Sequence, residues 1–174
     1  MVASPGPFAF APSYSYGRTD IKVTEALDEA EFFNGTASFS AVLPEDFALQ
    51  GFGAWQVSSK PLVTGDQLFQ IGGATTVRGY GNSVGGGSGY YANLELHKSF
   101  NGDFGVVDLF TFVDNGAVYS ISPSKISLTG VGAGVSYSYN QRLTLEATLG
   151  VPVGDPVPSS PDYTVFARVI GRIF

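Results

Sequence analysis

The feature that most constrains this chain is an alternation of apolar with small or polar residues along most of its length. In residues 127–139, Gly130, Gly132 and Gly134 occupy one parity, while Val131 and Val135 occupy the other. Successive side chains of an extended strand point to opposite faces, so this period predicts a strand with one apolar face and one small or polar face. The pattern predicts eight strands, at residues 8–16, 32–43, 47–59, 90–100, 105–119, 127–139, 143–151 and 163–174.

The low charge of the chain predicts the surroundings of these strands. Only 14% of the 174 residues are charged, against about 25% in an ordinary soluble domain. Segments of this length suffice for tilted strands to cross a bilayer, and the absence of an 18-residue apolar run argues against a membrane-spanning helix. A soluble β-sandwich would alternate in the same way. The long strands, glycine-lined faces and terminal Phe174 instead favour a single all-β domain over 1–174: an antiparallel transmembrane β-barrel of about eight strands in the lipid of a bacterial outer membrane.

Several other kinds of site are disfavoured. The acidic segment 18–31 lacks the spacing of a calcium loop and is predicted to be a solvated loop. A net charge of -6 argues against nucleic acid, and the chain has no cysteine. The single histidine, His97, falls on the polar parity of its strand with no nucleophile motif around it, and Gly85–Gly89 lacks the Lys-Ser/Thr of a phosphate loop. We therefore expect no enzyme activity, cofactor or metal.

A glycine-rich segment at about residues 66–89 interrupts the strands. Gly72, Gly73 and Gly79 suit a chain that folds back sharply, because glycine adopts backbone angles closed to other residues. Arg78 within this segment is a permanent cation whose planar fork suits a carboxylate. A plain surface loop with an incidental arginine would fit these residues equally well.

Short motifs follow one another in a distinctive order. They are Phe69-x-Ile71-Gly72-Gly73, Val77-Arg78-Gly79-Tyr80, Gly89-Tyr90 with Asn93-x-Glu95-Leu96, Phe112-x-Asp114-x-Gly116, Gly130-x-Gly132-x-Gly134, Ala147-x-x-Gly150-x-Pro152 and the terminal Phe174. From about residue 32 onward this order resembles the C-terminal half of the two-partner-secretion transporters, the TpsB proteins of the haemolysin secretion/activation class (ShlB/FhaC/HecB type). The Val-Arg-Gly-Tyr motif followed by Phe-x-Asp-x-Gly is the specific part of this resemblance.

The resemblance implies roles for individual residues. Transporters of this kind have sixteen strands, and their Val-Arg-Gly-Tyr loop folds into the pore, where its arginine pairs with an acid on the wall. Carried over, the loop motif is Val77, Arg78, Gly79 and Tyr80, the wall carboxylate is Asp114, and Glu95 is a second acid of inward parity. The terminal Phe174 corresponds to the signal read by the barrel assembly machinery.

The same resemblance implies secretion of an exoprotein partner of haemolysin or adhesin type. The chain corresponds to strands nine to sixteen, without the periplasmic POTRA domains, and residues 1–6 lack the basic and apolar regions of an export signal. A mature form or a fragment is therefore expected. Such a half barrel closes on itself, self-associates through its open edges or belongs to a longer parent. The alternative function is a small stand-alone structural barrel, natural or engineered, without transport activity.

Overall fold

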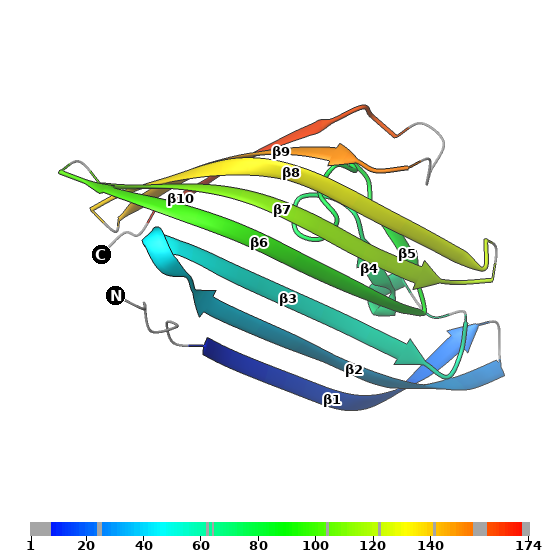
Figure 1. The fold of residues 1–174 in the computed structure, drawn as a ribbon. Helices are drawn as coiled ribbons and strands as arrows, with labels where there is room; N and C mark the ends of the chain where they lie inside the picture. The colour runs from blue at the N-terminus through cyan, green and yellow to red at the C-terminus, as the bar shows by residue number, and fades with distance from the viewer. Residues whose placement is uncertain are drawn as a thin grey trace.

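Eight long strands form one antiparallel sheet in the computed structural model (Figure 1). The structure describes residues 8–23, 26–61, 63, 65–103, 105–121, 123–140, 142–154 and 160–171, with the side chains of 19–29 excepted. In sheet order the strands are β1 (Phe8–Val23), β2 (Ala26–Val42), β3 (Phe47–Ser58), β6 (Ser88–Gly102), β7 (Gly105–Tyr119), β8 (Lys125–Tyr139), β9 (Leu143–Pro152) and β10 (Thr164–Gly171). The predicted all-β fold of about eight antiparallel strands is confirmed.

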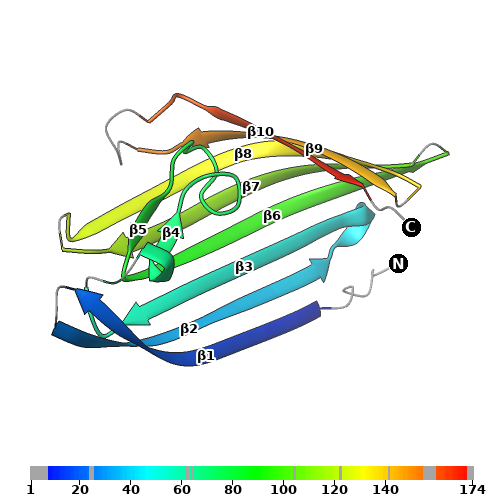
Figure 2. The ribbon, with the colours of Figure 1, turned by 180° about the vertical axis from the view of Figure 1, so that it is seen from behind.

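The segment between β3 and β6 lies over one face of this sheet. It contains the short strands β4 (Phe69–Ile71) and β5 (Val84–Gly86), which pair with each other, and a 3-10 turn at Gly65–Gln67. A second 3-10 turn, Pro44–Asp46, joins β2 to β3. Seen from behind, β4, β5 and the loop between them stand in front of the sheet (Figure 2). We call this face of the sheet the inner face and the opposite one the outer face.

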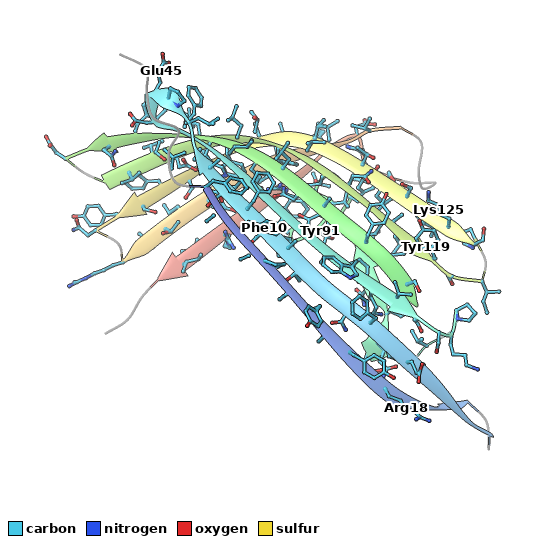
Figure 3. All side chains as sticks on the ribbon, turned by 60° about the horizontal axis from the view of Figure 1, so that its bottom comes forward. Phe10, Arg18, Glu45, Tyr91, Tyr119 and Lys125 are labelled. Atoms are coloured by element: carbon cyan, nitrogen blue, oxygen red, sulfur yellow. The ribbon has the colours of Figure 1, made fainter. Side chains whose placement is uncertain are left out.

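The alternation in the sequence sorts the side chains between these two faces. On β7, Phe110, Phe112 and Asp114 are buried on the inner face, whereas Leu109 and Val113 are exposed on the outer face. The outer faces of the neighbouring strands continue this apolar surface, and side chains stand out from both sides of the sheet in Figure 3. Among the described residues, no helix is long and apolar enough to cross a membrane.

Residues 18–31 do not form the solvated loop predicted for them. β1 continues to Val23 and β2 starts at Ala26, and the two strands pair without interruption from Phe8↔Ala41 to Val23↔Ala26. Residues 26–30 of β2 pair only with β1 among the described residues, because the hydrogen bonds on the other side of β2 begin at Glu31, whose carbonyl accepts from the N–H of Ser59, next to the pair Phe32↔Ser58. Backbone hydrogen bonds extend this hairpin past the apolar alternation, and polar composition alone therefore misled the prediction.

The sheet is open in this structure. Among the described residues β1 pairs only with β2, and β10 only with β9, so the sheet has two free edges. A closed barrel of eight strands has an interior that its own side chains just fill. Here the inner face also carries β4, β5 and their loop, for which a closed eight-stranded barrel would leave no room. The open sheet therefore fits half of a larger barrel.

The main apolar core lies between this loop segment and the sheet. Ile71, Val77 and Tyr80 of the segment pack with side chains of β6, β7 and β8. The sheet contributes Tyr91, Val118 and Leu128. A smaller cluster joins Phe32 to Val63 nearer the β1 edge. Apolar burial thus holds the segment on the inner face and brings its polar groups to the wall.

Candidate functional site

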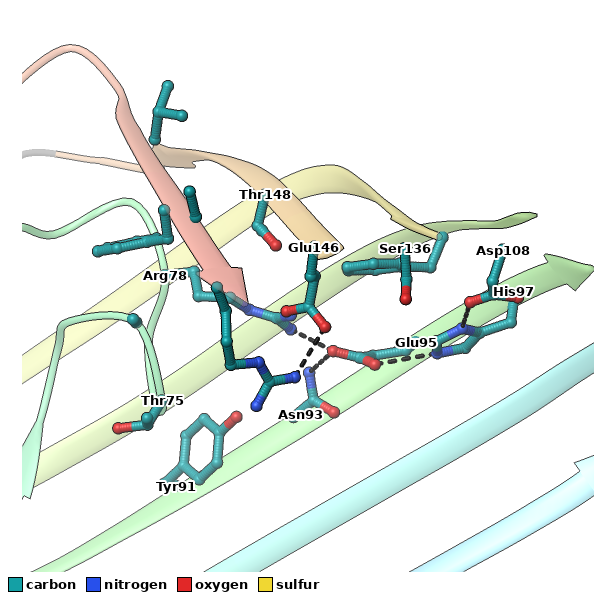
Figure 4. A pocket seen from close by; sticks show the side chains of 16 residues that line it. Thr75, Arg78, Tyr91, Asn93, Glu95, His97, Asp108, Ser136, Glu146 and Thr148 are labelled. Carbon is teal, nitrogen blue, oxygen red and sulfur yellow. Dashed lines mark hydrogen bonds and ion pairs between the residues drawn. The ribbon is translucent and has the colours of Figure 1, made fainter. Parts of the chain in front are cut away.

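The loop between β4 and β5, Gly72–Ser83, has a backbone that requires glycine at three positions. Gly72, Gly73 and Gly79 have φ values of 101°, 84° and 108°, in the left-handed region that side chains disfavour. The N–H of Gly73 donates to the carbonyl of Tyr80 over 2.9 Å, which closes the loop on itself. The closed loop presents Arg78 to the wall formed by β6 and β7 (Figure 4).

Arg78 forms a two-pronged ion pair with Asp114 of β7. Its Nε donates to Oδ2 and its Nη2 to Oδ1, each over 2.8 Å, and its backbone N–H donates to Oδ2 over 2.9 Å. The amide of Asn93 on β6 adds a fourth donor, 2.7 Å from Oδ1. Asp114 is fully buried, so these donors replace the water that a carboxylate otherwise needs.

Two further groups surround the guanidinium of Arg78. Glu95 of β6 places Oε1 2.6 Å from Nη2, and the ring of Phe112 lies beneath the guanidinium, with its centroid 3.5 Å from Cζ. Burial opposes the positive charge of Arg78, but Asp114 and Glu95 outweigh that effect and raise the pKa of the guanidinium above its ordinary value. The loop cation is therefore held by two acids and an aromatic face.

Glycines of the wall allow the loop backbone to approach β8 and β9. A Cβ at Gly130 would overlap the carbonyl oxygen of Arg78, and a Cβ at Gly150 would lie 2.9 Å from the carbonyl carbon of Arg78. On the loop side, a Cβ at Gly79 would come within 2.8 Å of the backbone of Val151. We call Gly130 and Gly150 the glycine seat. Side chains at these positions would hold the loop away from the wall.

Beyond Arg78, the inner face forms a cavity of about 680 Å³ with several charged groups. Its charged or titratable lining residues are Arg78, Tyr91, Glu95, His97, Asp108, Glu146 and Arg168. Arg168 of β10 pairs with Glu146 of β9 over 2.7 Å, with 62% of its side chain exposed. Among the described residues, no group of three His, Cys, Asp or Glu side chains is placed to hold a metal ion.

The structure brings together most residues singled out from the sequence. Arg78, Asp114 and Glu95 are in contact, and Val77 lies in the apolar core. The hydroxyl of Tyr80 donates to the carbonyl of Thr129 over 3.1 Å. Phe174 lies outside the described residues.

Other contacting residues were not assigned a role from the sequence. Phe112 and Asn93 belong to the motifs quoted above, and the shared parity of Phe112 and Asp114 could have placed both beside Arg78. The hydroxyl of Thr164 on β10 accepts a hydrogen bond from the N–H of Gly79 over 3.1 Å. No sequence signal marked Thr164, because this contact depends on how the loop is seated.

Comparison with known proteins identifies the family. The model of the family described as haemolysin secretion/activation protein ShlB/FhaC/HecB matches residues 9–137. The chain belongs to this family. Its members are outer-membrane transporters of two-partner secretion, and the eight-stranded sheet fits half of such a β-barrel.

A solved structure shows the same fold. CdiB from Escherichia coli superimposes with a TM-score of 0.82 at 20% sequence identity. The match covers 94% of this chain and 33% of the CdiB chain, so the present chain spans about a third of that length. A search of curated proteins gives no match.

Proposed function

We propose that this chain is the barrel half of an outer-membrane translocator that secretes a partner exoprotein of haemolysin or adhesin type. In this proposal the outer face contacts the lipid of a bacterial outer membrane, and the inner face lines the pore. The family membership and the apolar outer face support both assignments. The proposal also includes Phe174 as the contact for the barrel assembly machinery.

The loop Gly72–Ser83 is, in this proposal, an element of the pore that is fastened to its wall. We call the loop docked when Arg78 contacts Asp114. The observation that carries this proposal is the buried, two-pronged Arg78–Asp114 pair on the inner face. A loop of no functional consequence would not need a charged anchor whose partner is fully buried.

The alternative is a stand-alone structural barrel without transport activity. The open sheet disfavours it, because free edges in lipid leave backbone groups without hydrogen-bond partners. In the proposed function β1 and β10 join neighbouring strands of a larger barrel. These strands come from a longer parent chain or, through self-association, from a second copy.

Conductance across planar lipid bilayers tests the proposal. The chain is refolded in detergent and inserted, and Arg78→Ala is compared with the unchanged chain and with Arg142→Ala, a matched control at the exposed turn between β8 and β9. Release of the loop from the pore predicts a larger conductance for Arg78→Ala alone. An absence of conductance in all three proteins would show that this chain by itself, even through self-association, forms no pore, and equal conductance would contradict the docked loop.

A further inference from the structure

His97 lies between two carboxylates on the inner face. Its Nε2 is 3.0 Å from Oε2 of Glu95, and its Nδ1 is 2.6 Å from Oδ2 of Asp108. Asp108 is held in turn by the hydroxyl of Ser99, which donates to Oδ1 over 2.7 Å. A neutral imidazole has one N–H donor, so it can serve only one of these acids, whereas the doubly protonated ring donates to both.

Two lines of contact join His97 to the loop arginine. The first is ionic: Glu95 faces His97 with Oε2 and Arg78 with Oε1 (Figure 4). The second is aromatic: the imidazole stacks on Phe110 with centroids 5.2 Å apart, and Phe110 contacts Phe112, the ring beneath Arg78. Glu95 is therefore shared between a permanent cation from the loop and a titratable group on the wall.

We infer that His97, in its doubly protonated form, is the positioning residue that orients Glu95 toward Arg78 and so makes docking of the loop dependent on pH. This inference rests on the docked loop proposed above and adds its regulation. When the imidazole loses a proton, one of its nitrogens presents a lone pair to a carboxylate oxygen. The shorter contact, 2.6 Å to Asp108, keeps the remaining proton on Nδ1, so the lone pair on Nε2 faces Glu95. Glu95 then turns away, and its hold on Arg78 weakens.

The charges around His97 favour this reading. Glu95 on β6 and Asp108 on β7 face the ring directly, and the position opposite on β3 is Ala48. The cavity beyond contains Arg78 from the loop and the Glu146–Arg168 pair of β9 and β10. Arg168 is paired with Glu146, and Arg78 contacts both Asp114 and Glu95, so Glu95 is shared between Arg78 and His97, whereas Asp108 contacts His97 but not Arg78.

Protection of a single thiol measures docking directly, since the chain has no cysteine. Val77 belongs to the loop and is fully buried against the sheet, whereas Ala74 of the same loop is exposed. The rate at which a maleimide modifies the Ala74→Cys chain, divided by the rate for the Val77→Cys chain, gives a protection ratio. The division removes the intrinsic pH dependence of thiol reactivity.

The inference predicts that this ratio falls about tenfold as the pH rises from about 5 to 8.5. A change of that size corresponds to the loss of roughly one charge-assisted hydrogen bond, the one from His97 to Glu95. His97→Gln should give the lower ratio at every pH, and His97→Lys, which keeps a cation, should keep the higher one. A flat profile with His97 in place, or an unchanged step in His97→Gln, overturns the inference. Arg78→Ala serves as the separate test of docking: if it leaves the ratio unchanged, the docked loop itself is wrong.

Discussion

At the scale of single residues, the position of the loop depends on missing side chains as much as on the Arg78–Asp114 pair. Gly130 and Gly150 leave room for the backbone of Arg78 and Gly79 at the wall. The ion pair needs this close approach, because the backbone N–H of Arg78 itself donates to Asp114. The glycine seat and the charged anchor therefore work as one contact.

Gly130→Ala should displace the loop without disturbing the sheet. Gly130 has an ordinary strand backbone, but the added methyl group would overlap the carbonyl oxygen of Arg78. Overpacking of this kind costs about 1–3 kcal/mol, measured as the free energy of unfolding in detergent micelles. Gly53→Ala is the matched control, because its nearest atom would lie 3.6 Å away, an ordinary contact. Equal stabilities for the two variants would argue against the seat.

At the scale of elements, each long strand separates an outer apolar face from an inner face that is small, polar or packed beneath the loop segment. On β9, Leu145 and Leu149 are exposed on the outer face. The hydroxyl of Thr144, on the other parity, lies 3.0 Å from that of Ser138. Such an outer face suits contact with hydrocarbon, and such an inner face suits a pore.

Leu145→Arg and Thr144→Arg test this assignment on neighbouring residues of one strand. In lipid vesicles, an arginine on the outer face near the bilayer midplane should lower the free energy of unfolding by about 2–4 kcal/mol. The same arginine at Thr144 should cost much less, since the inner face offers water and acids. A reversed order of the two costs, or a chain that stays soluble and monomeric without detergent, would contradict a lipid-facing outer surface.

The elements also show what could be predicted from the sequence. Alternation located all eight long strands, because a strand with two different faces leaves a period of two. It failed at residues 18–31, where the hairpin pairs through its backbone and the residues do not alternate. The permanent charge of Arg78 marked it in the sequence, whereas the roles of Asp114 and Glu95 were implied by the resemblance to the two-partner-secretion transporters. The glycine seat and Thr164 could not be predicted, because these contacts follow from the path of the loop rather than from any local pattern.

At the scale of the whole molecule, an open half barrel carries a loop that is packed and ion-paired to its inner face. Apolar contacts of Ile71, Val77 and Tyr80 place the loop segment, and the buried pair fixes its tip. In this arrangement the loop is part of the folded molecule rather than a mobile connection between β3 and β6.

A double-mutant cycle on Arg78→Ala and Asp114→Ala tests that claim most directly, with unfolding in detergent micelles as the measurement. Removing either partner should cost about 3–5 kcal/mol, because the other charge is then buried without compensation. The double variant should cost far less than the sum of the two, since neither charge is left stranded. The cycle on Arg168→Ala and Glu146→Ala, a pair with an exposed arginine, serves as the control and should give a coupling of about 0–1 kcal/mol. A coupling for Arg78 and Asp114 as small as that of the control would show that the loop is not docked.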